Sequence, residues 1–143
     1  MEVMSEHSTR QMILYCHVVQ ALIRTFHLGL GAGTSPTSPF GREQHATSTP
    51  IASPMAARHA RVEEVLDLAD RMWSPDRDAD FATFPNMEHR PRIIVGVNSL
   101  ALARIAGNRA DGVNVRWSSD RARSQLAAAQ RPAGQRPFEL TAY

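Results

Sequence analysis

The turn Gly96-Val97-Asn98-Ser99 offers the clearest chemistry in this sequence. It joins a β-branched apolar run to a segment with helical periodicity. Ser99 is a good N-cap residue, because its hydroxyl can accept a hydrogen bond from an amide of the first helical turn. Amides left free at a helix N-terminus bind anions. The pattern therefore indicates a site for a phosphate group; an ordinary capped turn would have the same sequence.

A second candidate is the glycine-rich run GLGAG, from Gly29 to Gly33. It is not a dinucleotide-binding fingerprint, because it lacks the G-x-G-x-x-G spacing and no helix opens directly on it. It also lacks the lysine of a P-loop. Two interpretations stay open: glycines that pack tightly within a strand, or glycines that let a flat ring approach the backbone.

Candidate acids and bases are few. His45, in the stretch REQHA, is a candidate catalytic acid or base on a long polar segment, and a solvated loop histidine is the simpler interpretation. Arg42 and Glu43 beside it could contact a substrate. His27 is predicted on the glycine-bearing face of its strand, where packing is the alternative role. The six histidines show no metal-ligand spacing, so no metal is predicted. A nucleophile–base pair is also missing, as expected where a cofactor carries the reactive atom.

The phosphate-site turn lies inside a predicted strand–helix–strand unit, from Arg92 to Val115. The run from Ile93 to Val97 is typical of a buried parallel strand. The helix that follows is expected to end at Gly107-Asn108 through a left-handed conformation. Asp111-Gly112 then turns the chain into a second strand, Val113–Val115. Parallel strands joined in this way form a right-handed βαβ unit.

The flanking elements follow the same order of strand and helix. Phe26–Gly31 is predicted as a strand with Leu28 and Leu30 on one face. Thr34–Ser53 is predicted as a 20-residue loop. Ser53 and Pro54 then mark a helix start, as N-cap and first-turn proline. The helix, Pro54 to Trp73, has one apolar stripe: Val62, Val65, Leu66, Ala69, Met72 and Trp73.

The remaining segments are assigned more briefly. Ser74–Pro91 is a second long polar connection that Phe81 and Phe84 could anchor. A buried helix that contains Cys16 is predicted at Met12–Arg24, and a strand is predicted at Phe138–Ala142. Another helix is predicted at Asp120–Gln130, with Ser118 or Ser119 as its N-cap and with Pro132 and Gly134 ending it. Its inward residues are expected to be Ala122, Leu126 and Ala129.

Three segments together resemble the luciferase-like monooxygenase superfamily. They are IIVGVNS with the alanine-rich helix and ADGVNV that follow it, FHLGLGAG at Phe26–Gly33, and RVEEVLDLADRMW at Arg61–Trp73. The resemblance covers roughly residues 26–34, 56–73 and 91–143. Family members usually have a longer turn with a Gly-Arg pair before the GLGAG strand. Here Arg24-Thr25 runs straight into Phe26, so the resemblance does not extend to residues 1–25.

Members of that superfamily are flavin- or deazaflavin-dependent oxidoreductases built on a TIM barrel. The resemblance implies one domain, a partial (β/α)8 barrel of about four parallel strands with intervening helices, and FMN or a deazaflavin (coenzyme F-420) as cofactor. It places the phosphate-bearing tail of the cofactor at Gly96, Val97, Asn98 and Ser99, and the ring beside Gly31, Ala32 and Gly33.

Composition limits the alternatives. The chain has 143 residues, whereas a complete barrel needs about 250. All 16 basic residues are arginine and the net charge is only +2, without a basic run that would track nucleic-acid phosphates. A single cysteine excludes an intrachain disulfide and fits a cytoplasmic setting. The longest apolar stretch has 12 residues, short of the roughly 20 in a membrane span.

Three functional hypotheses follow. The first is a fragment of a flavin- or deazaflavin-dependent oxidoreductase that transfers hydride or activates oxygen for a small-molecule substrate, completed by a second copy or by a complementary barrel half. The second is a catalytically inactive, truncated remnant that self-associates through exposed sheet edges. The third is a small phosphate-binding α/β module outside that superfamily.

Overall fold

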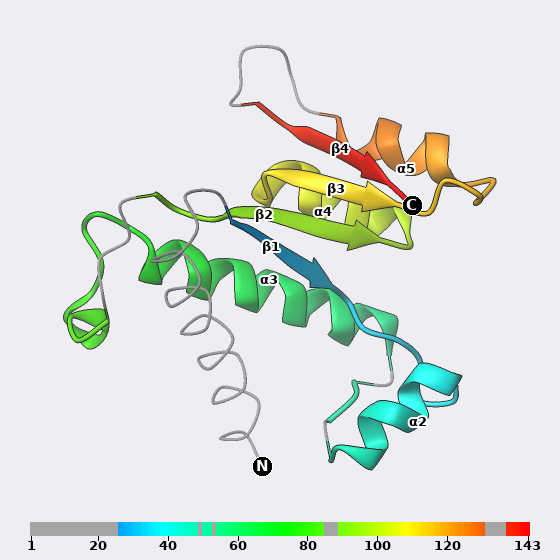
Figure 1. The fold of residues 1–143 in the computed structure, drawn as a ribbon, viewed down its shortest axis with the longest axis horizontal. Helices are drawn as coiled ribbons and strands as arrows, with labels where there is room; N and C mark the ends of the chain where they lie inside the picture. The colour runs from blue at the N-terminus through cyan, green and yellow to red at the C-terminus, as the bar shows by residue number, and fades with distance from the viewer. Residues whose placement is uncertain (1–25, 49, 53, 85–88, 131–136) are drawn as a thin grey trace.

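A computed structural model describes residues 26–48, 50–52, 54–84, 89–130 and 137–143. One or more helices separate each strand from the next along this part of the chain (Figure 1). In order, the elements are β1 (His27–Gly31), α2 (Pro39–Ala46), α3 (Met55–Met72), the short 3-10 helix η1 (Ala79–Phe81), β2 (Arg92–Val97), α4 (Leu100–Arg109), β3 (Gly112–Val115), α5 (Ala122–Ala129) and β4 (Glu139–Ala142).

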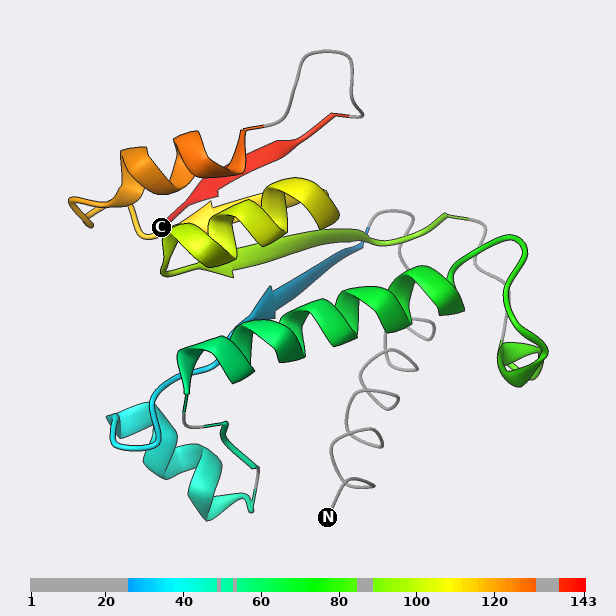
Figure 2. The same cartoon turned by 180° about the vertical axis from the view of Figure 1, so that it is seen from behind.

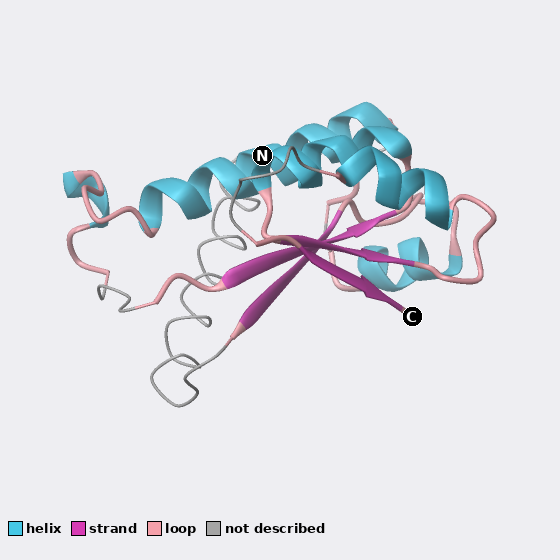
Figure 3. Cartoon of the chain, turned by 90° about the horizontal axis from the view of Figure 1, so that it is seen from above, coloured by secondary structure: helices cyan, strands magenta, loops and turns pink. Residues whose placement is uncertain are grey.

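The four strands form one parallel sheet in the order β1-β2-β3-β4. Helices α3, α4 and α5 lie in the connections between successive strands, and all three cover the same face of the sheet (Figures 2 and 3). Because each connection between neighbouring parallel strands crosses over with the same hand, the helices in these connections all lie on one face of the sheet. The predicted α/β class with parallel strands and intervening helices is therefore confirmed.

The two faces of the sheet differ in character. Side chains alternate between faces along each strand, and the rows that include Leu28, Val95 and Val115 belong to the core beneath the helices. The opposite face, here called the glycine face, carries two rows of β1, β2 and β3, Gly29-Ile94-Gly112 and Gly31-Gly96-Asn114, preceded by the pair His27 and Arg92. The prediction that Leu28 and Leu30 lie on the opposite face of the strand from its glycines is confirmed.

Helix α3 closely follows its prediction. All six residues of the predicted apolar stripe are buried, Leu66 at 1% exposure, while Glu63, Glu64 and Asp67 are exposed. The helix begins at Met55, because Pro54 takes the N-cap position with extended backbone and makes no side-chain cap. The prediction of Pro54 inside the first turn was therefore wrong, and Ser53 lies outside the described residues.

The segment predicted as a loop at Thr34–Ser53 contains a helix, so that prediction was wrong. Helix α2 begins after Ser38, whose Oγ accepts a hydrogen bond from the amide of Gly41 at 3.0 Å. Pro39 follows in the first turn. Ser38 is thus the N-cap of this helix and Pro39 stands in its first turn, the order expected at a helix start. The segment has so few apolar residues that hydrophobic periodicity does not predict the helix.

The predicted end of the helix after Ser99 was also wrong. Helix α4 continues through Gly107 and Asn108 to Arg109, and Ala110 then leaves it with extended backbone at φ −92° and ψ 174°. Gly107 has a packing role instead. A Cβ atom at that position would lie 2.5 Å from the carbonyl oxygen of Ala129 in α5, so glycine permits close contact between these two helices.

The other boundaries shift by one or two residues. Helix α5 begins after Arg121, and Ser119 Oγ instead accepts from the Arg121 amide at 3.2 Å in the preceding turn. Of the predicted inward residues, Ala122 and Ala129 are buried and Leu126 is partly buried against the core, and Gln125 is buried beside them. Phe81 is buried and Phe84 packs against the core, which confirms the predicted anchors. The predicted helix at 12–24 with Cys16, and the helix-ending Pro132 and Gly134, lie outside the described residues.

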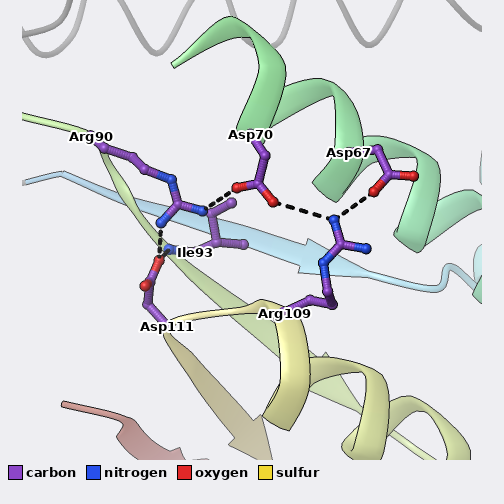
Figure 4. Close-up of polar contacts among 6 residues, drawn as sticks. All are labelled: Asp67, Asp70, Arg90, Ile93, Arg109 and Asp111. Carbon is purple, nitrogen blue, oxygen red and sulfur yellow. Dashed lines mark hydrogen bonds and ion pairs between the residues drawn. The ribbon is translucent and has the colours of Figure 1, made fainter. Parts of the chain in front are cut away.

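An ion-pair network ties the elements together at the amino ends of β2 and β3 (Figure 4). The buried carboxylate of Asp111 accepts hydrogen bonds from the Ile93 amide and from Arg90 Nη1, both at 2.9 Å. Arg90 Nη2 also donates to Asp70 on α3. Arg109 donates hydrogen bonds to Asp67 and Asp70, and these carboxylates raise the pKa of Arg109 above its ordinary value. The hydrogen bond to Asp67 contributes more to this increase than the hydrogen bond to Asp70 does. The network fastens α3 and α4 to the sheet.

Candidate functional site

The two predicted cofactor segments meet at one edge of the sheet. Gly31, at the end of β1, is the register partner of Gly96 in β2. Gly31–Gly33 and Gly96–Ser99 therefore leave neighbouring strands side by side at their carboxyl ends. In parallel α/β folds this edge is where ligands bind. The opposite, amino-terminal edge holds the ion-pair network of Asp111 and Arg90.

The turn at Gly96–Ser99 has the predicted cap. Ser99 is the N-cap of α4, and its Oγ accepts from the Leu102 amide at 3.1 Å. The Ser99 carbonyl accepts from the Ala103 amide. Within the described residues, the amides of Leu100 and Ala101 have no acceptor. Two free donors thus remain at the amino end of this helix, which is an arrangement that attracts anions.

His59 on α3 completes this corner of the site. The residue is 8% exposed, and its Nε2 lies 3.3 Å from Ser99 Oγ. Sequence reasoning missed His59, because its proximity to Ser99 depends on how α3 packs beside α4. A signal was available in principle: the first turns of α3 follow the carboxyl end of β1, so His59 had to lie near that edge.

The glycine face has room for a flat group at two positions. A Cβ atom added at Gly29 or Gly31 would meet nothing within 4 Å, and one at Gly96 would make an ordinary contact of 3.6 Å with the Leu30 carbonyl. At Gly112, in contrast, a Cβ atom would lie 2.5 Å from the Glu139 carbonyl. The glycines at 29 and 31 therefore leave open space, whereas Gly112 allows close strand packing.

A pocket of about 180 Å³ lies between the carboxyl end of β1 and α3. Gly31, Ala32 and Gly33 line it, and Gly33 has a positive φ of 64°. Its other walls are mainly apolar, but Arg58 and Arg61 of α3 and Gln44 of α2 also reach it. Sequence reasoning missed Arg58, which is 8% exposed.

The candidate acid–base residues do not line this pocket. His45, Arg42 and Glu43 are exposed on α2, and His45 lines a neighbouring hollow that shares Pro50 and Ile51 with the pocket. His27 lies on the glycine-bearing face of β1 as predicted, where its Nε2 is 3.8 Å from Glu139 Oε2. The described ranges contain no group of three or more His, Cys, Asp or Glu side chains that could hold a metal ion.

No protein-family model and no curated protein matches the sequence. The evidence on function therefore comes from the residues and their arrangement. None of the helices in the described ranges combines the length and the apolar content needed to cross a bilayer.

Proposed function

We propose that this chain is part of a flavin- or deazaflavin-dependent oxidoreductase of the luciferase-like type, and that its sheet is half of a (β/α)8 barrel. The observation that carries the proposal is the pairing of Gly31 with Gly96. This register puts the segment expected to face the cofactor ring beside the segment expected to hold the cofactor phosphate.

The sheet topology supports a barrel wall. Sequential parallel strands with every helix on one face are the repeating unit of a (β/α)8 barrel, whereas a doubly wound sheet has helices on both faces. The glycine face would then be the barrel interior. Among the described residues no strand pairs with the outer edge of β1 or β4, and a sheet of this width does not close on itself.

The residues present fit such a cofactor. The free amides of Leu100 and Ala101, with the Ser99 hydroxyl, would receive a phosphate group. The open backbone at Gly29 and Gly31 would face the ring. When bound, the ring would supply hydride transfer or oxygen activation. The protein's own contribution would be to grip the phosphate and to present the ring to a substrate at this edge.

A cofactor-retention experiment tests the proposal. Purified protein is mixed with FMN or with the deazaflavin, desalted, and examined for visible absorbance that elutes with the protein. Retention of either compound supports the cofactor-binding part of the proposal. Loss of both from a chain that circular dichroism shows to be folded would contradict it.

Self-association is a second candidate role, which the exposed apolar side chains favour. Leu140 on β4 is 54% exposed, and Trp117 and Tyr143 near the same strand are 64% and 75% exposed. Unpaired strand edges with apolar side chains promote association. Light scattering should therefore report a dimer or larger species. A compact monomer near 15.8 kDa that binds FMN tightly would contradict both this role and the half-barrel interpretation.

A further inference from the structure

We propose that the pocket between the end of β1 and α3 binds a small apolar carboxylate, and that Arg58 is the residue that binds its charge. This site shares Gly31, Ala32 and Gly33 with the segment proposed to face the cofactor ring, but its argument does not depend on a bound cofactor. Its two components are a buried guanidinium and a mainly apolar cavity of limited size.

The guanidinium of Arg58 lacks a suitable partner. The residue is 8% exposed, and its Nε atom has no hydrogen-bond partner in the described part of the chain. Among the residues that the structure describes, its Nη2 donates only to the thioether sulfur of Met55, at 3.5 Å, and a thioether is a weak acceptor. No ion pair among the described residues places a carboxylate on Arg58. A buried charge without a counter-charge is costly, so an anionic ligand would satisfy a group that the protein leaves unsatisfied.

The walls of the pocket define the rest of the ligand. Leu30, Ile51, Val62 and Val65 supply apolar surface. The volume of about 180 Å³ is close to that of engineered apolar cavities, about 150 Å³, that bind benzene. The body of the ligand should therefore be about the size of one phenyl ring.

A carboxylate fits this pocket better than a phosphate does. A guanidinium presents a planar pair of donors that matches the two oxygens of a carboxylate. Arg61 also lines the pocket, but its side chain is 41% exposed and paired with Glu64. Its charge is therefore already paired with that of Glu64. One buried guanidinium among apolar walls would leave most of the oxygens of a phosphate dianion without donors.

Calorimetric titration with benzoate, without any flavin present, tests the proposal. Wild-type protein should bind benzoate, and benzyl alcohol should bind about 10- to 100-fold more weakly, because it lacks the charge that Arg58 receives. Arg58→Met should weaken benzoate binding by a similar factor. Arg104→Met, which removes an exposed arginine on α4, should leave binding unchanged.

Thermal unfolding of the same variants separates a binding role from a structural one. Methionine has a similar length without the charge, so Arg58→Met should keep or raise the Tm of the ligand-free protein. Failure of wild type to bind benzoate, equal binding by Arg58→Met, or a clear fall in its Tm would each overturn the proposal. Tighter binding of inorganic phosphate than of benzoate would overturn the ligand class. Because no flavin is present, failure of the cofactor proposal would not affect the result.

Discussion

Ser99 Oγ lies 3.3 Å from His59 Nε2, so the N-cap of α4 is also in contact with α3. Ser99 Oγ already accepts from the Leu102 amide, so His59 in its Nε2–H tautomer would donate a second hydrogen bond to Oγ and leave the hydroxyl proton for the cofactor phosphate. His59→Leu should lower FMN affinity about three- to tenfold, the value of one hydrogen bond. Riboflavin affinity should not change. His45→Leu, at an exposed position on α2, is the matched control and should leave both affinities intact.

Gly31→Val tests the proposed ring-facing backbone. The added side chain has open space, and valine is favourable in strands, so the free energy of unfolding should stay the same or rise by up to about 1 kcal/mol. The affinities for FMN and riboflavin should both fall, because both compounds carry the ring. Gly112→Val is the contrast: it meets the Glu139 backbone and should destabilise the protein. If Gly31→Val binds both flavins normally, the ring does not lie on the glycine face.

Asp111→Ala tests the network at the amino ends of the strands. The substitution leaves the Ile93 amide and the Arg90 guanidinium without their buried acceptor. We expect a loss of about 3 kcal/mol in unfolding free energy, near the lower limit for breaking a buried pair, because Arg90 is one-quarter exposed. Chemical denaturation measures the loss. Asp76→Ala, at an exposed position, should change stability by less than about 0.5 kcal/mol; equal effects of the two variants would contradict the role given to Asp111.

Gly107→Ala tests the close contact between α4 and α5. In an exposed helix interior this substitution would stabilise by about 1 kcal/mol. Here the new Cβ atom would meet the backbone of Ala129 at 2.5 to 3.0 Å, so we expect a destabilisation of about 1 to 3 kcal/mol. Asn108→Ala, one residue later and exposed, should have the opposite sign. A stabilising Gly107→Ala would mean that the two helices are not in contact at this point.

The sequence predicted the features that depend on local signals. The strand at Arg92–Val97, the Ser99 cap and the apolar stripe of α3 could all be predicted, because β-branched runs, capping residues and helical periodicity act over a few residues. The role of Gly107 could not be predicted, because glycine near a helix end usually permits a left-handed turn. Only the approach of Ala129 shows that it serves packing instead.

The candidate site could be predicted only in part, for the same reason. Gly31–Gly33 and Gly96–Ser99 each have a recognisable sequence, and parallel pairing of their strands brings them together. His59 and Arg58 have no sequence signal of their own. Both lie in the first turns of α3 and become part of the site because that helix packs against the sheet.

Comparison of FMN with riboflavin in equilibrium titrations is the most direct test of the central claim that Gly96–Ser99 holds a cofactor phosphate. The two compounds share the ring and differ in the phosphate group. We predict that wild-type protein binds FMN at least about tenfold more tightly than riboflavin, as expected for one or two charge-assisted hydrogen bonds. Ser99→Glu, which places a negative charge at the site, should abolish the difference. Equal affinity of the unmodified protein for the two flavins, or no binding of either, would contradict the claim.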